Sequence, residues 1–147
     1  MNLFDLHSNP EQLAHYNEQI KVPFIAYNKT MQAIYADEDY EDYRQYIQYF
    51  KDDPKLAMRY AEELNGRFIE GEPAIATNPI LAYEYALYTL VGDRFPEGEP
   101  AIMKNPEYAY KYAVDIMSNE RWKEAEPYIQ QDPKWWQKYK NYFRNEF

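Results

Sequence analysis

A unit of 27 residues recurs three times without insertion, and it constrains the fold more than any other feature of the sequence. The first copy begins at Arg67 with the run Arg-Phe-Ile-Glu-Gly-Glu-Pro-Ala-Ile, and Asn78-Pro79 follows it. Arg94 and Arg121 open the second and third copies, each 27 residues after the one before. A fixed period of about 20–50 residues is typical of stacked repeats, in which each unit buries its apolar face against its neighbours. We therefore expect a helical-repeat, α-solenoid-like domain.

Each long helix of this domain is expected to begin at an Asn-Pro or Asp-Pro pair. Asn and Asp cap helices, and proline suits the first helical position because its missing N–H has no partner there. Such pairs occur five times, as Asn9-Pro10, Asp53-Pro54, Asn78-Pro79, Asn105-Pro106 and Asp132-Pro133. A tyrosine follows each proline by six residues, as Tyr16, Tyr60, Tyr85, Tyr112 and Tyr139. We count a shortened copy over residues 54–66 and an echo of the repeat at Pro10 and Tyr16.

Two further helices are expected, one from Pro23 and one over residues 37–50. The run Glu-Gly-Glu-Pro-Ala-Ile between the long helices indicates a short helix with proline in its first turn. Sustained apolar alternation and hairpin dipeptides such as Asn-Gly are absent from the sequence. The sequence therefore predicts an all-α fold with seven main helices and short helices between them.

Small residues recur where neighbouring long helices should approach one another. Alanine stands three and seven residues after the helix-starting proline in the inner helices, at Ala57, Ala61, Ala82, Ala86, Ala109 and Ala113. In the last helix the same positions hold Trp136 and Lys140. This change predicts that the last helix closes the stack, with Lys140 facing water. Gly71, Gly98 and Ala125 share one repeat position, so we expect ordinary backbone geometry and crowding there.

Length and composition favour a single soluble domain. The chain has 147 residues, which we divide into an acidic, Tyr-rich N-terminal part (1–53) and the repeats with their capping helix (54–147). It has no cysteine, no apparent signal peptide and no apolar run long enough to span a membrane, so we expect a cytoplasmic protein. Its net charge of −9 disfavours direct binding to nucleic acid.

The repeat pattern resembles a known group of sequences. Arg-[Phe/Trp]-x-Glu-[Gly/Ala]-Glu-Pro-x-Ile, followed by [Asn/Asp]-Pro and a Tyr- and Ala-rich helix, is similar to short repeats of tailed-bacteriophage proteins of unassigned function. The resemblance covers roughly residues 54–143 and matches residues 1–50 poorly. It implies a helical phage accessory protein, which would act in the host cytoplasm, and it supplies no catalytic residues.

Catalytic chemistry finds little support in the residue types present. The only histidines are His7 and His15, and the only serines are Ser8 and Ser118. Four glycines do not make a phosphate-binding loop. The best carboxylate sets are the pairs Glu70/Glu72, Glu97/Glu99 and Glu124/Glu126, which could bind a divalent cation or flank a glycosidic bond. Each pair opens a short helix near a repeated arginine, and repetition favours structure over catalysis. We expect no enzyme, cofactor or metal site.

The segment 37–50 is the candidate binding surface. Its tyrosines Tyr40, Tyr43, Tyr46 and Tyr49 spread over more than one helical face, so one core contact cannot bury them all. We expect Tyr43, Ile47 and Phe50 to face inward, and the alternative reading is that all the rings belong to the core and its boundary. The predicted partner-binding residues are Asp39, Asp42, Tyr46 and Tyr49, which couple aromatic area to negative charge.

The leading hypothesis is therefore a non-enzymatic module that binds a host or defence protein through that protein's basic surface. The alternative is an acidic mimic of nucleic acid that blocks a DNA- or RNA-binding cleft. A hydrolase that uses the Glu pairs is a third and weaker hypothesis. Salt separates the first two, because the complex of a charge mimic weakens steeply with ionic strength.

Overall fold

A computed structural model describes residues 10–36 and 43–147 of the chain, apart from the side chains at positions 12, 13, 16, 19 and 20. These residues form helices and turns and contain no strand, which confirms the all-α prediction. The longer helices are α2 (Pro10–Ile20), α3 (Pro23–Tyr35), α5 (Pro54–Leu64), α7 (Pro79–Glu84), α9 (Pro106–Asp115) and α11 (Pro133–Tyr142). A π-helical turn, η3 (Tyr85–Thr89), continues α7.

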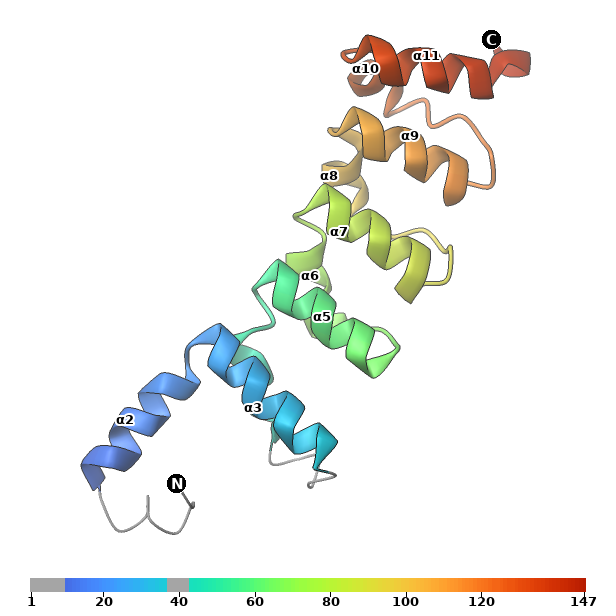
Figure 1. Cartoon of the computed structure of the whole chain (residues 1–147). Helices are drawn as coiled ribbons and strands as arrows, with labels where there is room; N and C mark the ends of the chain where they lie inside the picture. Colours follow the sequence, from blue (N-terminus) through green and yellow to red (C-terminus); the bar gives the residue numbers. More distant parts are fainter. Residues whose placement is uncertain (1–9, 37–42) are drawn as a thin grey trace.

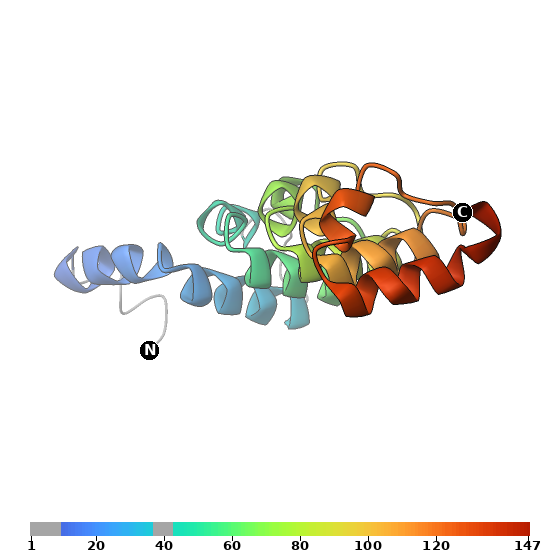
Figure 2. The same cartoon turned by 90° about the horizontal axis from the view of Figure 1, so that it is seen from above.

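Short helices alternate with these long ones. They are η1 (Ile47–Tyr49), η2 (Ile69–Gly71), α6 (Glu72–Ile75), α8 (Glu99–Met103), α10 (Glu126–Ile129) and η4 (Arg144–Glu146). From α3 to α11 the long helices lie side by side in chain order (Figure 1). Figure 2 shows the short helices η1, α6, α8 and α10 as a second row along one side of the long ones. The connections after α5, after α7 with η3, and after α9 therefore return to the short-helix row.

The helix starts follow the sequence prediction. In α5, α7, α9 and α11 the proline occupies the first turn, and the preceding Asp or Asn side chain accepts backbone N–H bonds. Asp53, for example, accepts from the N–H of Leu56 at 3.0 Å. The short helices α6, α8 and α10 likewise carry proline in their first turn, at Pro73, Pro100 and Pro127.

The core runs along the contact between the two rows. Its largest fully buried side chains include one tyrosine from each of α5, η3, α9 and α11 and one isoleucine from each of α6, α8 and α10, namely Tyr60, Tyr85, Tyr112, Tyr139, Ile75, Ile102 and Ile129. The six alanines expected at close helix contacts are all fully buried. Gly71, Gly98 and Ala125 are buried with φ between −83° and −93°, which confirms ordinary geometry with crowding. A Cβ added at Gly71 would lie 2.4 Å from the Phe68 ring.

The predicted long helix over 37–50 is wrong where the structure describes it. Residues 43 and 44 are helical, a turn follows, and η1 then leads to Asp53. Phe50 precedes Pro54 by four residues, just as Ile75 precedes Pro79, and both side chains are fully buried. This segment therefore takes the place of a short helix against α3. Tyr43 and Ile47 are also buried, as expected for the inward stripe.

The long helix that precedes α5 in the row and packs on it is α3, and the contact positions of α3 were not identified from the sequence. Ala26 and Thr30 stand three and seven residues after Pro23, and both are fully buried. The Thr30 hydroxyl donates to the carbonyl oxygen of Ala26 at 2.9 Å, which satisfies it inside the contact. At the corresponding position of α2, Asn17 is exposed, so the small-residue contact belongs to α3 rather than to the helix that begins at Pro10.

Candidate functional site

An identical set of polar contacts holds each of the three copies together. In the first copy, Arg67 donates from Nε and Nη2 to the two carboxylate oxygens of Glu72 at 2.8 and 3.0 Å. The hydroxyl of Tyr85 donates to Glu72 at 2.8 Å and accepts from the N–H of Phe68 at 3.1 Å. The same bonds join Arg94, Glu99, Tyr112 and Phe95, and then Arg121, Glu126, Tyr139 and Trp122.

These contacts tie each long helix to the loop and short helix before it. The Glu72 side chain is 4% exposed, and its charge is compensated by the bidentate guanidinium and by the tyrosine hydroxyl. Burial, together with the hydrogen bond to Glu72, raises the pKa of Tyr85 to about 12. Burial raises the pKa of Tyr112 and of Tyr139 in the same direction. These groups stay neutral at physiological pH and act as hydrogen-bonded braces.

The Glu pairs singled out in the sequence divide into two roles. The second glutamate of each pair, whose side chain is largely buried, forms the ion pair with the repeated arginine. The first glutamate is exposed in every copy, at Glu70, Glu97 and Glu124. Glu70 lies 3.3 Å from Arg44 of the preceding segment. The ion pairs with the arginines thus give the second glutamate of each pair a structural role.

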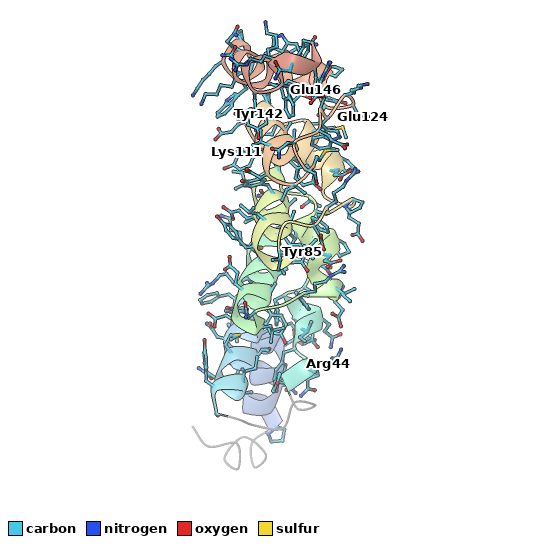
Figure 3. The ribbon with its side chains drawn as sticks, turned by 90° about the vertical axis from the view of Figure 1, so that its right-hand side faces the viewer. Arg44, Tyr85, Lys111, Glu124, Tyr142 and Glu146 are labelled. Atoms are coloured by element: carbon cyan, nitrogen blue, oxygen red, sulfur yellow. The ribbon has the colours of Figure 1, made fainter. Side chains whose placement is uncertain are left out.

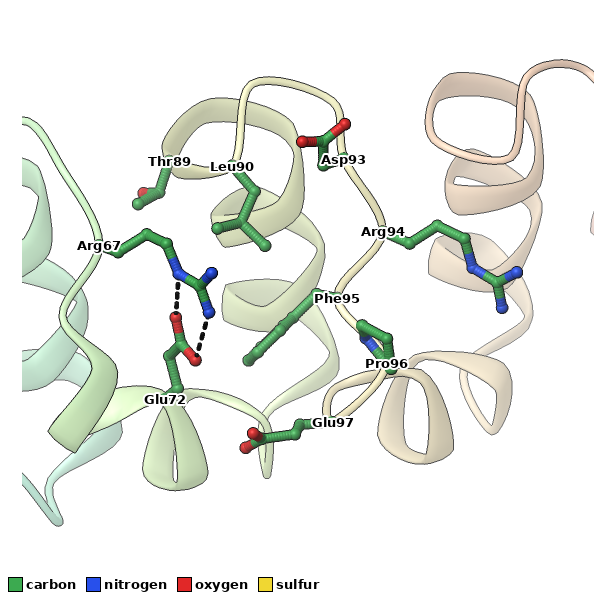
Figure 4. Close-up of a pocket in the computed structure, with 9 residues that line it drawn as sticks. All are labelled: Arg67, Glu72, Thr89, Leu90, Asp93, Arg94, Phe95, Pro96 and Glu97. Carbon is green, nitrogen blue, oxygen red and sulfur yellow. Dashed lines mark hydrogen bonds and ion pairs between the residues drawn. The ribbon is translucent and has the colours of Figure 1, made fainter.

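The arginines of the first two copies also border open space. Arg67 lies beside a cavity of about 470 Å³ whose other walls include Thr89, Leu90, Asp93 and Phe95. Figure 4 shows the Arg67 side chain directed toward Glu72 and Leu90, whereas Arg94 points away toward the next copy. A second hollow of about 290 Å³ lies beside Arg94, Ile116 and Met117. The Arg67 and Arg94 side chains are 57% and 53% exposed, so their guanidinium groups are accessible.

Exposed apolar side chains collect at the carboxyl ends of the long helices. We call this surface the helix-end edge and define it by Tyr35, Leu64, Tyr88, Val91 and Tyr142. Tyr88 is 71% exposed and Val91 is 86% exposed. Figure 3 looks onto this end of the stack, with Tyr142 near its upper part. Large apolar side chains gathered on one rim are typical of protein interaction sites, whereas single exposed ones are ordinary.

Acids accompany the apolar residues of the helix-end edge. The exposed ones are Glu62, Glu63, Asp93, Asp115 and Glu120. Glu62 and Glu63 lie in the last turn of α5, Asp115 ends α9, and neither helix has a basic residue in its last turn. The helix dipole disfavours acids at this end by about 0.3–1 kcal/mol each. Hydrogen bonds from Tyr35 to Glu63 and from Tyr83 to Asp115 offset part of that cost.

Val91 has an unfavourable backbone conformation at the centre of the helix-end edge. Its φ is 54°, in the left-handed region that β-branched residues avoid. It follows η3, the π-helical turn that the described residues contain only here, and such turns are frequent at functional sites. The matching position of the second copy holds Ser118, also at φ 54°, and after α5 the left-handed residue is Asn65. Because the Val91 side chain is exposed, its burial does not offset the free-energy cost of this backbone conformation. Such strained residues cluster at binding sites.

The residues predicted to bind a partner are only partly described. Asp39 and Asp42 lie outside the described residues. Tyr46 and Tyr49 are half-buried, and their rings pack against the core next to η1. The structure thus places Tyr46 and Tyr49 together beside the buried Ile47 and Phe50, in the short-helix row. Sequence reasoning missed Tyr88 and Val91, although a valine where the other helices end in Asn65 or Ser118 was a visible signal.

Two other kinds of site find no support in residues 10–36 and 43–147. Within that part of the chain, no three His, Cys, Asp or Glu side chains are grouped to hold a metal ion. In the same residues, no helix combines the length and apolar character needed to cross a bilayer.

The chain matches no protein-family model, no curated protein and no solved structure. Its function must therefore be argued from its own residues.

Proposed function

We propose that this protein is a non-enzymatic, α-solenoid-like helical-repeat module that binds another protein through its helix-end edge. Recurrence of the same arginine, glutamate and tyrosine contacts every 27 residues supports the repeat architecture. Because each copy braces its own long helix, the stack is a rigid scaffold that holds one continuous row of helix ends.

The observation that carries the proposal is Val91, which is both strained and 86% exposed. A residue at such a φ costs about 1–3 kcal/mol, and an exposed side chain returns little of that in the free protein. Tyr88 lies three residues earlier and is also exposed. Together they offer an aromatic ring and an apolar side chain on a rigid base, which is the composition typical of binding hot spots.

The partner's chemistry follows from the acids of the helix-end edge. Glu62, Glu63, Asp93 and Glu120 are exposed there, whereas Arg67 and Arg94 are already paired with Glu72 and Glu99. The edge therefore favours a protein with a basic surface. The resemblance to phage repeats supports a host or defence protein in the host cytoplasm as that partner.

Affinity capture with matched variants tests this proposal. The wild-type protein and the double variant Tyr88→Ser, Val91→Asn are immobilised and incubated with a bacterial lysate, and bound proteins are identified by mass spectrometry. The control double variant is Phe24→Ser, Ile80→Asn, which removes exposed apolar groups from the first turns of α3 and α7. We expect a protein that is retained by the wild type and the control and lost with the edge variant. Identical captures by all three proteins would contradict the proposal.

Salt distinguishes the proposed interface from an acidic mimic of nucleic acid. An interface anchored by Tyr88 and Val91 should lose little affinity between low and physiological salt, since its apolar contacts are not screened. A complex that weakens steeply over that range, and that survives the edge substitutions, would instead support charge mimicry.

A further inference from the structure

In the third copy, the residues that follow α11 occupy the face of the repeated arginine. Nη1 of Arg121 donates to the carbonyl oxygen of Glu146 at 2.7 Å. The ring of Phe147 lies over the guanidinium, with its centroid 3.8 Å from Cζ. The Phe147 ring also packs edge to face against the rings of Trp136 and Tyr139, at centroid distances of 5.7 and 6.3 Å. As a result the Arg121 side chain is only 18% exposed.

The first two copies present the same guanidinium without such a cover. Among the described residues, Arg67 and Arg94 form hydrogen bonds from Nε and Nη2 alone, each to its own glutamate. Nη1, which binds a carbonyl oxygen in the third copy, is available in both. The cavity of about 470 Å³ at Arg67 and the hollow of about 290 Å³ at Arg94 leave room beside these groups.

We infer that Arg67 and Arg94 are binding sites for an aromatic residue in a short segment of the partner. Nη1 takes the carbonyl oxygen of the residue before the aromatic one, and the aromatic ring stacks on the guanidinium, as Glu146 and Phe147 do on Arg121. The inference rests on the proposed function and names what the helix-end edge recognises.

The charges around the cavity select a neutral ring over an anion. Glu72 already holds the Arg67 guanidinium in a bidentate pair, and Arg94, which also lines the cavity, is paired with Glu99 in the same way. Asp93 and Glu97 are the other charged residues of the lining. A phosphate or carboxylate placed there would meet uncompensated negative charge. Leu90 and Phe95 supply apolar wall instead. The geometry suits an aromatic side chain whose flanking residues are basic or uncharged.

The probe follows the chain's own example, residues 144–147, with Gln in place of Glu146 so that no acid flanks the ring: a synthetic peptide Arg-Asn-Gln-Phe with an acetylated amino end and an amidated carboxyl end. It is titrated to several millimolar into the isotope-labelled full chain, and amide chemical shifts are recorded. We expect saturable shifts at Arg67 and at residues 89–93. A peptide with Ala in place of Phe147 should bind about two- to fivefold more weakly, because an exposed cation–π contact contributes about that factor.

Two variants of the full chain complete the test. Arg67→Lys keeps the charge but loses the planar fork, so it should weaken the shifts at residues 89–93 about threefold or more. Phe147→Ala uncovers Arg121, so it should add a further set of saturable shifts around residue 121. Absence of shifts near Arg67, or shifts unaffected by both the alanine peptide and Arg67→Lys, would overturn the inference.

The outcome is separable from that of the proposed function. If capture of a partner is lost with the Tyr88 and Val91 substitutions but the peptide does not bind near Arg67, the helix-end edge is supported as the binding surface and this inference is wrong. If the peptide binds as expected but capture is unaffected by the edge variant, the proposed function is wrong and the arginine sites serve a different ligand.

Discussion

Tyr85 donates a hydrogen bond of 2.8 Å to Glu72, thirteen residues earlier, and so links a long helix to the short helix before it. The same hydroxyl accepts from the buried N–H of Phe68 at 3.1 Å. Removing this one oxygen therefore takes a donor from a buried carboxylate and an acceptor from a buried backbone group. Neither loss can be made good by water, because Tyr85 is fully buried.

Tyr85→Phe should destabilise the protein by about 2–3 kcal/mol, since both groups left behind are buried. Its matched control is Tyr83→Phe on the same helix, whose hydroxyl bonds the exposed Asp115, and this change should cost less than about 1 kcal/mol. Urea unfolding of the two variants measures the difference. Equal losses at both positions would show that the contact to Glu72 is not a structural brace.

Close contact between long helices makes the alanine positions intolerant of charge. Ala86→Lys or Ala113→Lys should destabilise by about 3 kcal/mol or more, because both side chains are fully buried. Lys140 is at the same position of the last helix, is half-buried and reaches over the Trp136 ring at 5.7 Å. Lys140→Ala should therefore be nearly neutral. Thermal unfolding of the three variants checks this, and similar losses at all three would contradict the alignment of the repeats.

The helix starts could be predicted because their signal is local. A proline with a preceding Asn or Asp carries its own cap, and four such pairs begin helices where expected. The segment 43–50 could not be assigned from its apolar spacing, because Tyr43, Ile47 and Phe50 fit one face of a long helix equally well. Counting backward from Pro54 would have matched Phe50 with Ile75 and revealed a short helix.

The candidate site was predicted less well than the fold. Its bonds depend on how two helices pack, so the sequence shows Arg67 near Glu72 but not that the Tyr85 hydroxyl reaches the same carboxylate. Val91 reads in the sequence as an ordinary apolar residue unless it is aligned with Ser118 of the next copy, and only the structure shows that its φ of 54° makes the difference matter. The acids Asp39 and Asp42 stay a prediction, since they lie outside the described residues.

Because Val91 is strained, replacing it should stabilise the free protein even though it weakens partner binding. Val91→Asn should stabilise the free protein by about 1 kcal/mol, because asparagine tolerates the left-handed conformation. The reciprocal change Asn65→Val, at φ 50° after α5, should destabilise by about 1–2 kcal/mol. Chemical unfolding of both variants measures these effects. If Val91→Asn is destabilising, the valine contributes contacts within the free protein and the argument for a partner at this residue fails.

Tyr46 and Tyr49 test whether the interface extends into the short-helix row. Both rings pack against the core but keep part of their surface exposed. The double variant Tyr46→Ala, Tyr49→Ala should lose the captured partner while still unfolding cooperatively, at a cost of about 1–3 kcal/mol for each ring. Capture and a thermal melt of the same preparation are compared. Normal binding, or a chain that no longer folds, would assign both tyrosines to the core alone.

Alkaline pH should unfold the protein through its buried tyrosines. The pKa of Tyr85 is about 12 in the folded protein, against about 10 for an unfolded tyrosine. Between these values the unfolded chain has released the proton and the folded chain has kept it, so stability falls as pH rises. The contribution of Tyr85, about 3 kcal/mol, is complete below pH about 10 and is lost toward pH about 12. Tyr112 and Tyr139 act in the same direction. Melting temperatures recorded across this range should drop together with the rise of tyrosinate absorbance, and Tyr85→Phe should show a shallower drop than the wild type.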